Sequence, residues 1–198
     1  MSNEITMKTL CLGLLLFLGP HAARMMAEDW RRRQIDRFGL QRWKAAVSLI
    51  SLGGLALIVI GYGQARAEQS DLWLVPTGAR HLAALLTLPA LVLITAAYVP
   101  RSRLHSRLGH PMLLGTAIWA FAHLLANARP AELLLFGSFL AWSGSAFCAA
   151  RRRDRRDHLQ QAPALAGRDA LSALIGLGLW IAVVFWLHPL WIGTRPLG

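Results

Sequence analysis

Residues 109–127 read GHPMLLGTAIWAFAHLLAN, and this stretch predicts an apolar helix with its polar groups on one stripe. At 3.6 residues per turn, the stripe contains Met112, Thr116, Trp119, His123 and Asn127. Lipid offers no hydrogen-bond partners, so a polar stripe on so apolar a helix must face other protein or a ligand. We therefore expect the chemistry of this protein to lie on this helix.

Apolar blocks of similar length lie on both sides of this stretch. The chain has 198 residues, 55% of them hydrophobic, and a mean hydropathy of +0.43. Blocks of about 20 apolar residues match the hydrocarbon core of a bilayer. The sequence therefore predicts an all-α fold, a polytopic membrane helical bundle in a single domain over residues 1–198. The predicted membrane helices, about six in number, are 5–23, 45–63, 81–99, 111–128, 133–150 and 170–190.

The basic residues predict the orientation of these helices. In a soluble chain, the net charge of +11 would suggest nucleic acid, but here the bases cluster between the apolar blocks, so nucleic-acid binding is not expected. The connections after the first, third and fifth helices carry 16 of the 21 Lys and Arg residues. By the positive-inside rule these connections are cytoplasmic, and both termini lie on the outer side. Either Met1 or Met7 could be the true start.

The basic connection at residues 28–44 has aromatic residues among its charges, and two interpretations of it stay open. One is an interfacial segment that lies on anionic lipid, and the other is a solvated loop with interfacial aromatics. The neighbouring predicted helix, 45–63, contains four glycines, which we expect to allow close helix packing. Small residues at 137–145 predict a similar packing face on the fifth helix.

Three of the seven histidines are candidates for a cofactor site: His21, His110 and His123. Imidazoles within a membrane often have a function, although a single one can also be a hydrogen-bonded packing residue. A pair of neutral imidazoles is a common axial ligation of haem b, and the lack of a C-x-x-C-H motif agrees with non-covalent haem. Of the other four, His105 and His158 lie in basic loops and are expected to be solvated, and His81 and His188 lie at helix ends and are expected to be structural.

Helical geometry limits which histidines could share one iron. His110 and His123 are 13 residues apart, or about 20 Å along a helix, so they cannot both bind it. His21 could pair with either of them, and the residues alone leave this choice open. Motifs for zinc hydrolysis, serine hydrolysis and P-loop nucleotide binding are absent from the sequence.

The chain resembles the NnrU family of bacterial membrane proteins. The matching motifs are LGLLLFLGPHAAR around His21, RWKAAVSLISLGGLALIVIGYGQAR, GHPMLLGTAIWAFAHLLAN and LLLFGSFLAW, which together cover about residues 8–145. Plastid zeta-carotene isomerases, which are related to this family, are thought to use haem b. The resemblance implies that His21 and His123 are the axial ligands of the haem iron, and that His110 is the His-Pro residue near the cofactor. Ala120 stands where the isomerases have a cysteine.

The resemblance implies a function and a location. We expect an inner-membrane protein of bacteria, with periplasmic termini, that binds haem b and is associated with nitrite or nitric oxide reduction in denitrification. One alternative is cis-trans isomerisation of zeta-carotene or a related isoprenoid, with a lipophilic polyene as substrate. Another is a non-enzymatic membrane partner that helps to assemble a nitrite or nitric oxide reductase. Membrane lipid is an expected partner in each case.

Overall fold

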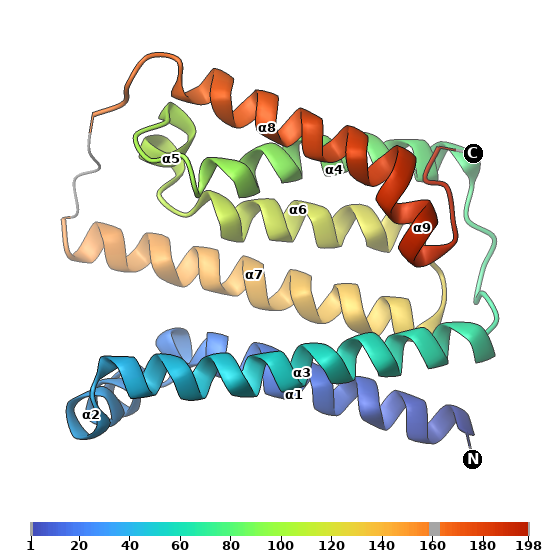
Figure 1. The fold of residues 1–198 in the computed structure, drawn as a ribbon, viewed down its shortest axis with the longest axis horizontal. Coiled ribbons are helices and arrows are strands. Elements are labelled where there is room, and N and C mark those ends of the chain that lie inside the picture. Colours follow the sequence, from blue (N-terminus) through green and yellow to red (C-terminus); the bar gives the residue numbers. More distant parts are fainter. Residues whose placement is uncertain (1, 159–162, 198) are drawn as a thin grey trace. The chain divides into compact units, whose positions relative to one another are not determined.

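The chain is built from α-helices (Figure 1). The computed structural model describes residues 2–158 and 163–197; 83% of the structure is helix, and the described residues contain no strand. The helices are α1 (Ser2–Met26), α2 (Glu28–Phe38), α3 (Leu40–Glu68), α4 (Thr77–Ala96), α5 (Arg103–Leu108), α6 (Pro111–Ala126), α7 (Pro130–Arg156), α8 (Arg168–Ala182), the π-helix η1 (Val183–Leu187) and α9 (His188–Ile192). The prediction of an all-α fold is confirmed.

Two compact units contain these helices. The first consists of Met1–Leu72 and Arg129–Ser138, and therefore of α1, α2, α3 and the start of α7. The second consists of Trp73–Ala128 and Phe139–Gly198, which hold the remaining helices and the rest of α7. The prediction that residues 1–198 form a single domain stays a prediction.

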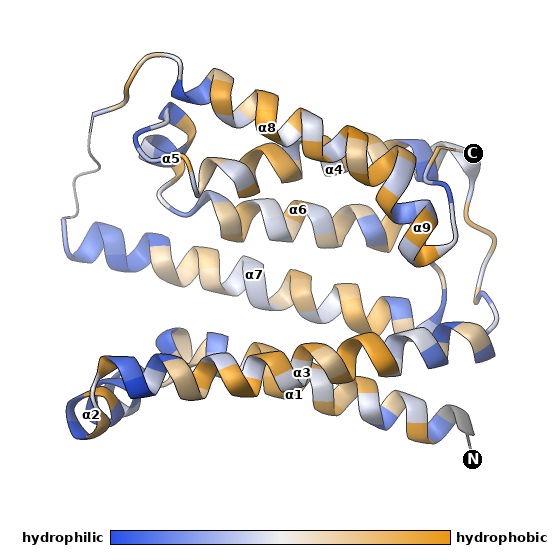
Figure 2. Ribbon diagram, viewed as in Figure 1, coloured by the Kyte–Doolittle hydropathy of each residue, from blue (hydrophilic) through white to orange (hydrophobic). Residues whose placement is uncertain are grey.

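Five helical segments are long and apolar enough to cross a membrane: α1, α3, α4, α7 and Arg168–Ile192. Helix α6 is apolar but has only 16 residues, or about 24 Å of length. Bands of apolar residues cover the middle of these helices (Figure 2). Large side chains such as Leu15, Leu49 and Leu174 are 68–71% exposed, as is natural for groups that face lipid. The chain is a multi-pass membrane protein.

Several helices extend beyond the apolar blocks that predicted them. Helix α3 begins at Leu40 rather than residue 45 and ends at Glu68 rather than 63, and α7 continues to Arg156 rather than 150. Hydropathy marks only the part of a helix that lies in lipid, while Arg, Gln and Glu favour continuation of the helix in water. The same propensity makes α2 a helix within the segment predicted as a basic connection. Gly39, with φ 84°, separates α2 from α3.

In the first unit, α1 and α3 are antiparallel and pack through glycines. A methyl group added at Gly13 would lie 2.6 Å from the backbone nitrogen of Ile58, and one at Gly61 would lie 2.6 Å from that of Leu10. Gly54 is equally close to Phe17, whereas Gly53 and Gly63 face open space. The predicted close packing of this helix is therefore confirmed for two of its four glycines.

In the second unit, α4 packs against both α6 and α8. Gly115 of α6 approaches the carbonyl of Ala90, and Gly176 of α8 approaches Val92, each at 2.7 Å from an added methyl group. Trp180 of α8 donates its indole N–H to the carbonyl of Ala84 at 2.9 Å. The hydroxyl of Thr95 in α4 also donates to the carbonyl of Ser172 in α8 at 2.9 Å. Helix α4 therefore packs against its two neighbours through small residues, and hydrogen bonds add to its contact with α8.

The small residues predicted as a packing face of α7 do not all serve that purpose. A methyl group placed at Gly137 or Gly144 would meet no atom within 4 Å, so the prediction is wrong for both glycines. Ser143 is fully buried and donates its hydroxyl to the carbonyl of Phe139 in its own helix. Composition alone does not show which face of a helix its small residues occupy.

Candidate functional site

His123 lies in the last turn of α6, which begins with Pro111 at its first position. Its ring Nδ1 is 2.8 Å from the carbonyl oxygen of Trp119, one turn earlier, and its ring centroid is 4.8 Å from that of Trp119. The side chain of Asn127 donates to the carbonyl of His123 at 2.7 Å and so satisfies a carbonyl at the helix end. The Trp119 ring in turn packs edge-on against Phe139 of α7. The imidazole is thus held by Trp119 of its own helix, through both a hydrogen bond and a ring contact.

The contact with Trp119 decides the tautomer of neutral His123. A carbonyl oxygen can only accept a hydrogen bond, so Nδ1 must carry the proton and donate it. The lone pair of the neutral ring is then on Nε2. A histidine that ligates a metal commonly donates its other ring N–H to a carbonyl in this way, which orients the ring and raises its basicity as a ligand.

His21 in α1 has the same local arrangement. Its Nδ1 lies 2.6 Å from the carbonyl oxygen of Phe17, also one turn earlier. The two rings are stacked, with centroids 4.9 Å apart and planes inclined by 28°. By the same reasoning, Nδ1 donates and Nε2 carries the lone pair when the ring is neutral. Two of the three predicted site histidines therefore share one tautomer and an aromatic residue four positions earlier.

His110 has a different environment. It precedes α6 as the N-cap residue, and its Nε2 lies 3.1 Å and 3.3 Å from the two carboxylate oxygens of Asp154 in α7. Asp154 is also 3.8 Å from Arg151. This contact occupies the nitrogen that His21 and His123 would offer to a metal, so His110 acts here as a link between the start of α6 and the end of α7.

The structure places the three predicted histidines in different parts of the fold. His110 and His123 belong to the second unit and lie at opposite ends of the continuous helix α6, which agrees with the predicted separation of about 20 Å. His21 belongs to the first unit. Within the two described ranges, no group of three or more His, Cys, Asp and Glu side chains is arranged to hold a metal ion.

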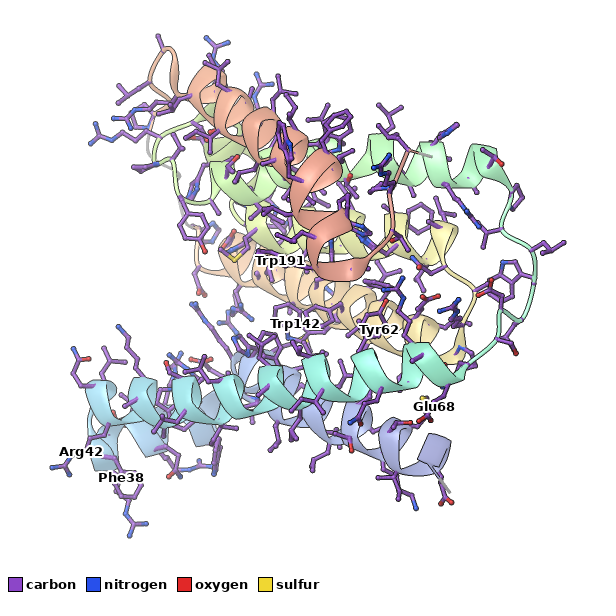
Figure 3. The ribbon with its side chains drawn as sticks, turned by 45° about the vertical axis from the view of Figure 1, so that its right-hand side comes forward. Phe38, Arg42, Tyr62, Glu68, Trp142 and Trp191 are labelled. Atoms are coloured by element: carbon purple, nitrogen blue, oxygen red, sulfur yellow. The ribbon has the colours of Figure 1, made fainter. Side chains whose placement is uncertain are left out.

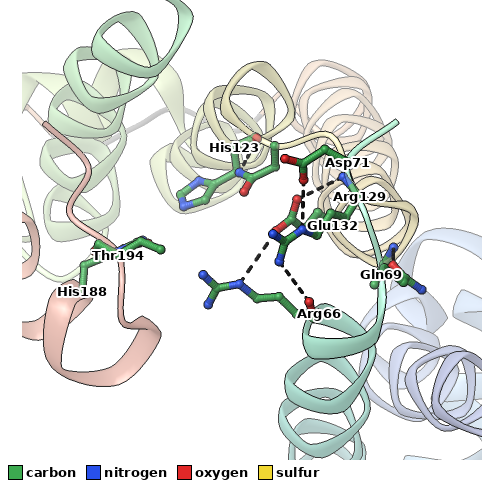
Figure 4. Close-up of polar contacts among 10 residues, drawn as sticks. Arg66, Gln69, Asp71, His123, Arg129, Glu132, His188 and Thr194 are labelled. Atoms are coloured by element: carbon green, nitrogen blue, oxygen red, sulfur yellow. Dashed lines mark hydrogen bonds and ion pairs between the residues drawn. The ribbon is translucent and has the colours of Figure 1, made fainter. Parts of the chain in front are cut away.

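Another histidine of the second unit, His188, begins α9 directly after the π-helix Val183–Leu187. Its Nδ1 lies 2.8 Å from the carbonyl oxygen of Thr194, so this ring too has the lone pair on Nε2 when neutral (Figure 4). Sequence reasoning regarded His188 as structural because it lies at a helix end, and the π-turn before it has no clear sequence signal.

The first unit also contains a charged cluster that the sequence did not predict. Arg129 donates to the carboxylate of Asp71 at 2.9 Å and to the carbonyl of Arg66 at 2.9 Å (Figure 4). Glu132, only 4% exposed, accepts the backbone N–H of Arg129 at 3.1 Å and lies 4.0 Å from the guanidinium of Arg66. The one available signal was an acid in the first turn of α7, a position that stabilises a helix N-terminus.

The family model described as "NnrU protein" matches residues 9–196 of this chain. No curated protein and no solved structure matches the sequence. The match extends the resemblance seen in residues 8–145 to α8 and α9, and it includes all of the histidines described above.

Proposed function

The chain belongs to the NnrU family, and from this premise we propose that it is a membrane protein that binds haem b, with His21 and His123 as the candidate axial ligands. The observation that carries the proposal is their shared local geometry. Each ring donates its Nδ1 proton to the carbonyl four residues earlier and has its lone pair on Nε2 when neutral. This is the donor arrangement that a haem iron takes from a neutral imidazole.

The surroundings of His123 favour the neutral ring that such ligation needs. Helix α6 has no acidic residue, and Trp119 lies directly against the imidazole. An aromatic neighbour excludes water, and the carbonyl contact prevents the ring from turning about its own axis. His123 would therefore reach a cofactor without first having to lose a proton or reorient.

When bound, haem b supplies an iron that changes oxidation state, which suits either electron transfer or redox-dependent isomerisation. A buried methyl group favours the first of these roles. Ala120, which stands where the isomerases have a cysteine, is fully buried in α6. It offers no thiolate as an alternative ligand, so isomerisation by exchange between a thiolate and an imidazole lacks the residue that would perform it at this position. We therefore propose a redox role associated with nitrite or nitric oxide reduction.

The location is part of the proposal. We assign the chain to the inner membrane of a bacterium with both termini in the periplasm, because 16 of its 21 bases lie in the three connections predicted to be cytoplasmic. In this topology His123, at the carboxyl end of α6, lies toward the periplasmic face, and His21, near the carboxyl end of α1, lies toward the cytoplasmic face. One haem held by both histidines therefore requires the two helices to be tilted or shifted in depth.

The absorption spectrum of the purified protein tests the proposal. Protein from haem-replete cells should show a Soret band and, after reduction with dithionite, the sharp α and β bands of a low-spin haem b. His123→Ala and His21→Ala should each abolish the low-spin bands, whereas His110→Ala should retain them because Asp154 already occupies its Nε2. A folded preparation without haem would refute the proposal. It would leave the non-enzymatic assembly role, to be tested by copurification with reductase subunits.

A further inference from the structure

Helix α2 has properties that the haem proposal does not use. It joins α1 to α3 through single residues, Ala27 and Gly39, and none of its side chains is buried. With 11 residues it is only about 16 Å long and cannot span a bilayer. Its axis runs across the direction of α1 and α3, which pack side by side as membrane spans (Figure 1). A helix of this length and direction is suited to lie along the membrane surface.

The charges of α2 are unequally paired. Glu28 accepts from Arg31 at 3.4 Å and from Arg32 at 3.3 Å, so these two arginines are partly neutralised within the helix. Within the described ranges, no carboxylate lies at ion-pair distance from Arg33 or Arg37, and both side chains are exposed. Three more exposed bases lie close by in the sequence: Arg24, Arg42 and Lys44.

The ring of Trp30 lies on the same side of α2 as these two arginines, and Phe38 is next to one of them. Trp30, Arg33 and Arg37 are spaced by three and four residues and so share one face. Trp30 is 47% exposed and contacts Trp43 of α3 edge-on, with ring centroids 5.5 Å apart. The guanidinium of Arg37 lies 5.0 Å above the Phe38 ring, which is also 47% exposed. Figure 3 shows Phe38 pointing away from the helices at this end of the unit.

We propose that α2 and the start of α3 form a binding surface for acidic phospholipid, with Arg33 and Arg37 on the headgroup phosphates and with Trp30 and Phe38 inserted at the level of the headgroups. Unpaired arginines match the charge of an anionic leaflet, and exposed aromatic rings match its polar–apolar border. A soluble acidic protein would satisfy the charges but would leave both rings in water. The surface therefore fits lipid better than protein.

Hydrogen–deuterium exchange of the intact protein tests this inference. The protein is reconstituted in nanodiscs of phosphatidylcholine, either alone or mixed with phosphatidylglycerol, and exchange of the α2 amides is followed by mass spectrometry. We expect slower exchange with phosphatidylglycerol and a smaller difference at high salt. The attraction of one basic side chain to an anionic leaflet corresponds to about a fivefold gain in affinity for that leaflet per arginine. Arg33→Gln with Arg37→Gln should therefore remove most of the difference in exchange between the two lipid compositions.

Two controls separate lipid binding from loss of structure. Arg152→Gln with Arg155→Gln removes the same charge from exposed positions of α7 and should leave the exchange of α2 unchanged. Arg33→Lys with Arg37→Lys keeps the charge and should retain the effect. Equal exchange in both lipids, or an effect that survives removal of both charges, would overturn the proposal. This readout does not involve haem, so it stands or falls separately from the proposed function.

Discussion

The glycine contacts between α1 and α3 lead to a prediction with a matched control on adjacent residues. Gly54→Ala adds a methyl group 2.6 Å from the backbone nitrogen of Phe17 and 2.9 Å from the carbonyl carbon of Leu16. Gly53→Ala adds the same group to the same helix, one residue earlier, where no atom lies within 4 Å. The two variants differ only in the face of α3 that receives the methyl group.

The structure gives the size of the effect. Ordinary van der Waals contact begins at 3.4 Å, so a methyl group at residue 54 requires α1 and α3 to move apart by about 0.8 Å. The atoms that it meets belong to the backbone, so no flexible side chain can move aside instead. Overpacking of this kind costs about 1–3 kcal/mol. Both variants gain the same helix propensity from alanine, about 1 kcal/mol, and this gain cancels in the comparison. Gly54→Ala should therefore be less stable than Gly53→Ala by about 1–3 kcal/mol.

Thermal unfolding in detergent, followed by circular dichroism and by the monodisperse fraction in size-exclusion chromatography, measures this difference. For a chain of this length, 1 kcal/mol corresponds to about 2–4 °C in Tm, so Gly54→Ala should melt several degrees below Gly53→Ala. Gly61→Ala, which meets Leu10 at 2.6 Å, should behave like Gly54→Ala. Equal melting temperatures for Gly53→Ala and Gly54→Ala would show that the glycines do not set the distance between these helices.

Three further outcomes are expected from the contacts described above. Glu132→Ala should lower the free energy of unfolding by about 1.5–3 kcal/mol, because a buried charged acceptor is lost. Glu132→Gln should lower it less, because its amide oxygen can still accept from Arg129. Chemical denaturation in detergent measures both effects. Asp154→Ala should lower the free energy of unfolding by about 1 kcal/mol, because His110 loses its partner. The haem spectrum should not change, because His110 and His123 lie at opposite ends of α6, and altered low-spin bands would contradict this. Alkaline phosphatase fused after the last residue should be active if the carboxyl terminus is periplasmic, and fusion within residues 151–156 should be inactive; the reverse pattern would invert the topology.

The apolar blocks were sufficient to predict the membrane helices, because hydropathy over 20 residues reports directly on burial in lipid. They could not predict where the helices end, since residues beyond the membrane continue a helix by propensity alone. The segment 28–44 shows this difference. Its charges and aromatic residues left two interpretations open, and the structure adds the helix α2 and its direction across α1 and α3.

The candidate site was predictable to different degrees. The positions of His21 and His123 came from the sequence, but their tautomers required the distances to the carbonyls of Phe17 and Trp119. The Arg129 cluster could not be predicted, because Arg129 contacts groups 58 and 63 residues earlier in the chain. Without a repeat or a motif to align these segments, nothing in the local pattern indicates that the residues meet.

The π-helix at Val183–Leu187 makes the direction of the His188 side chain depend on the number of residues in this segment. A π-turn contains one residue more than the α-helical path would need, and that residue rotates everything after it by about 100° around the helix axis. Removal of one residue from this segment would restore a regular helix and turn His188 to another side of it. The remaining residues of the segment would be unchanged. In evolution, a single-codon insertion or deletion here would redirect this histidine without a substitution at any helix contact.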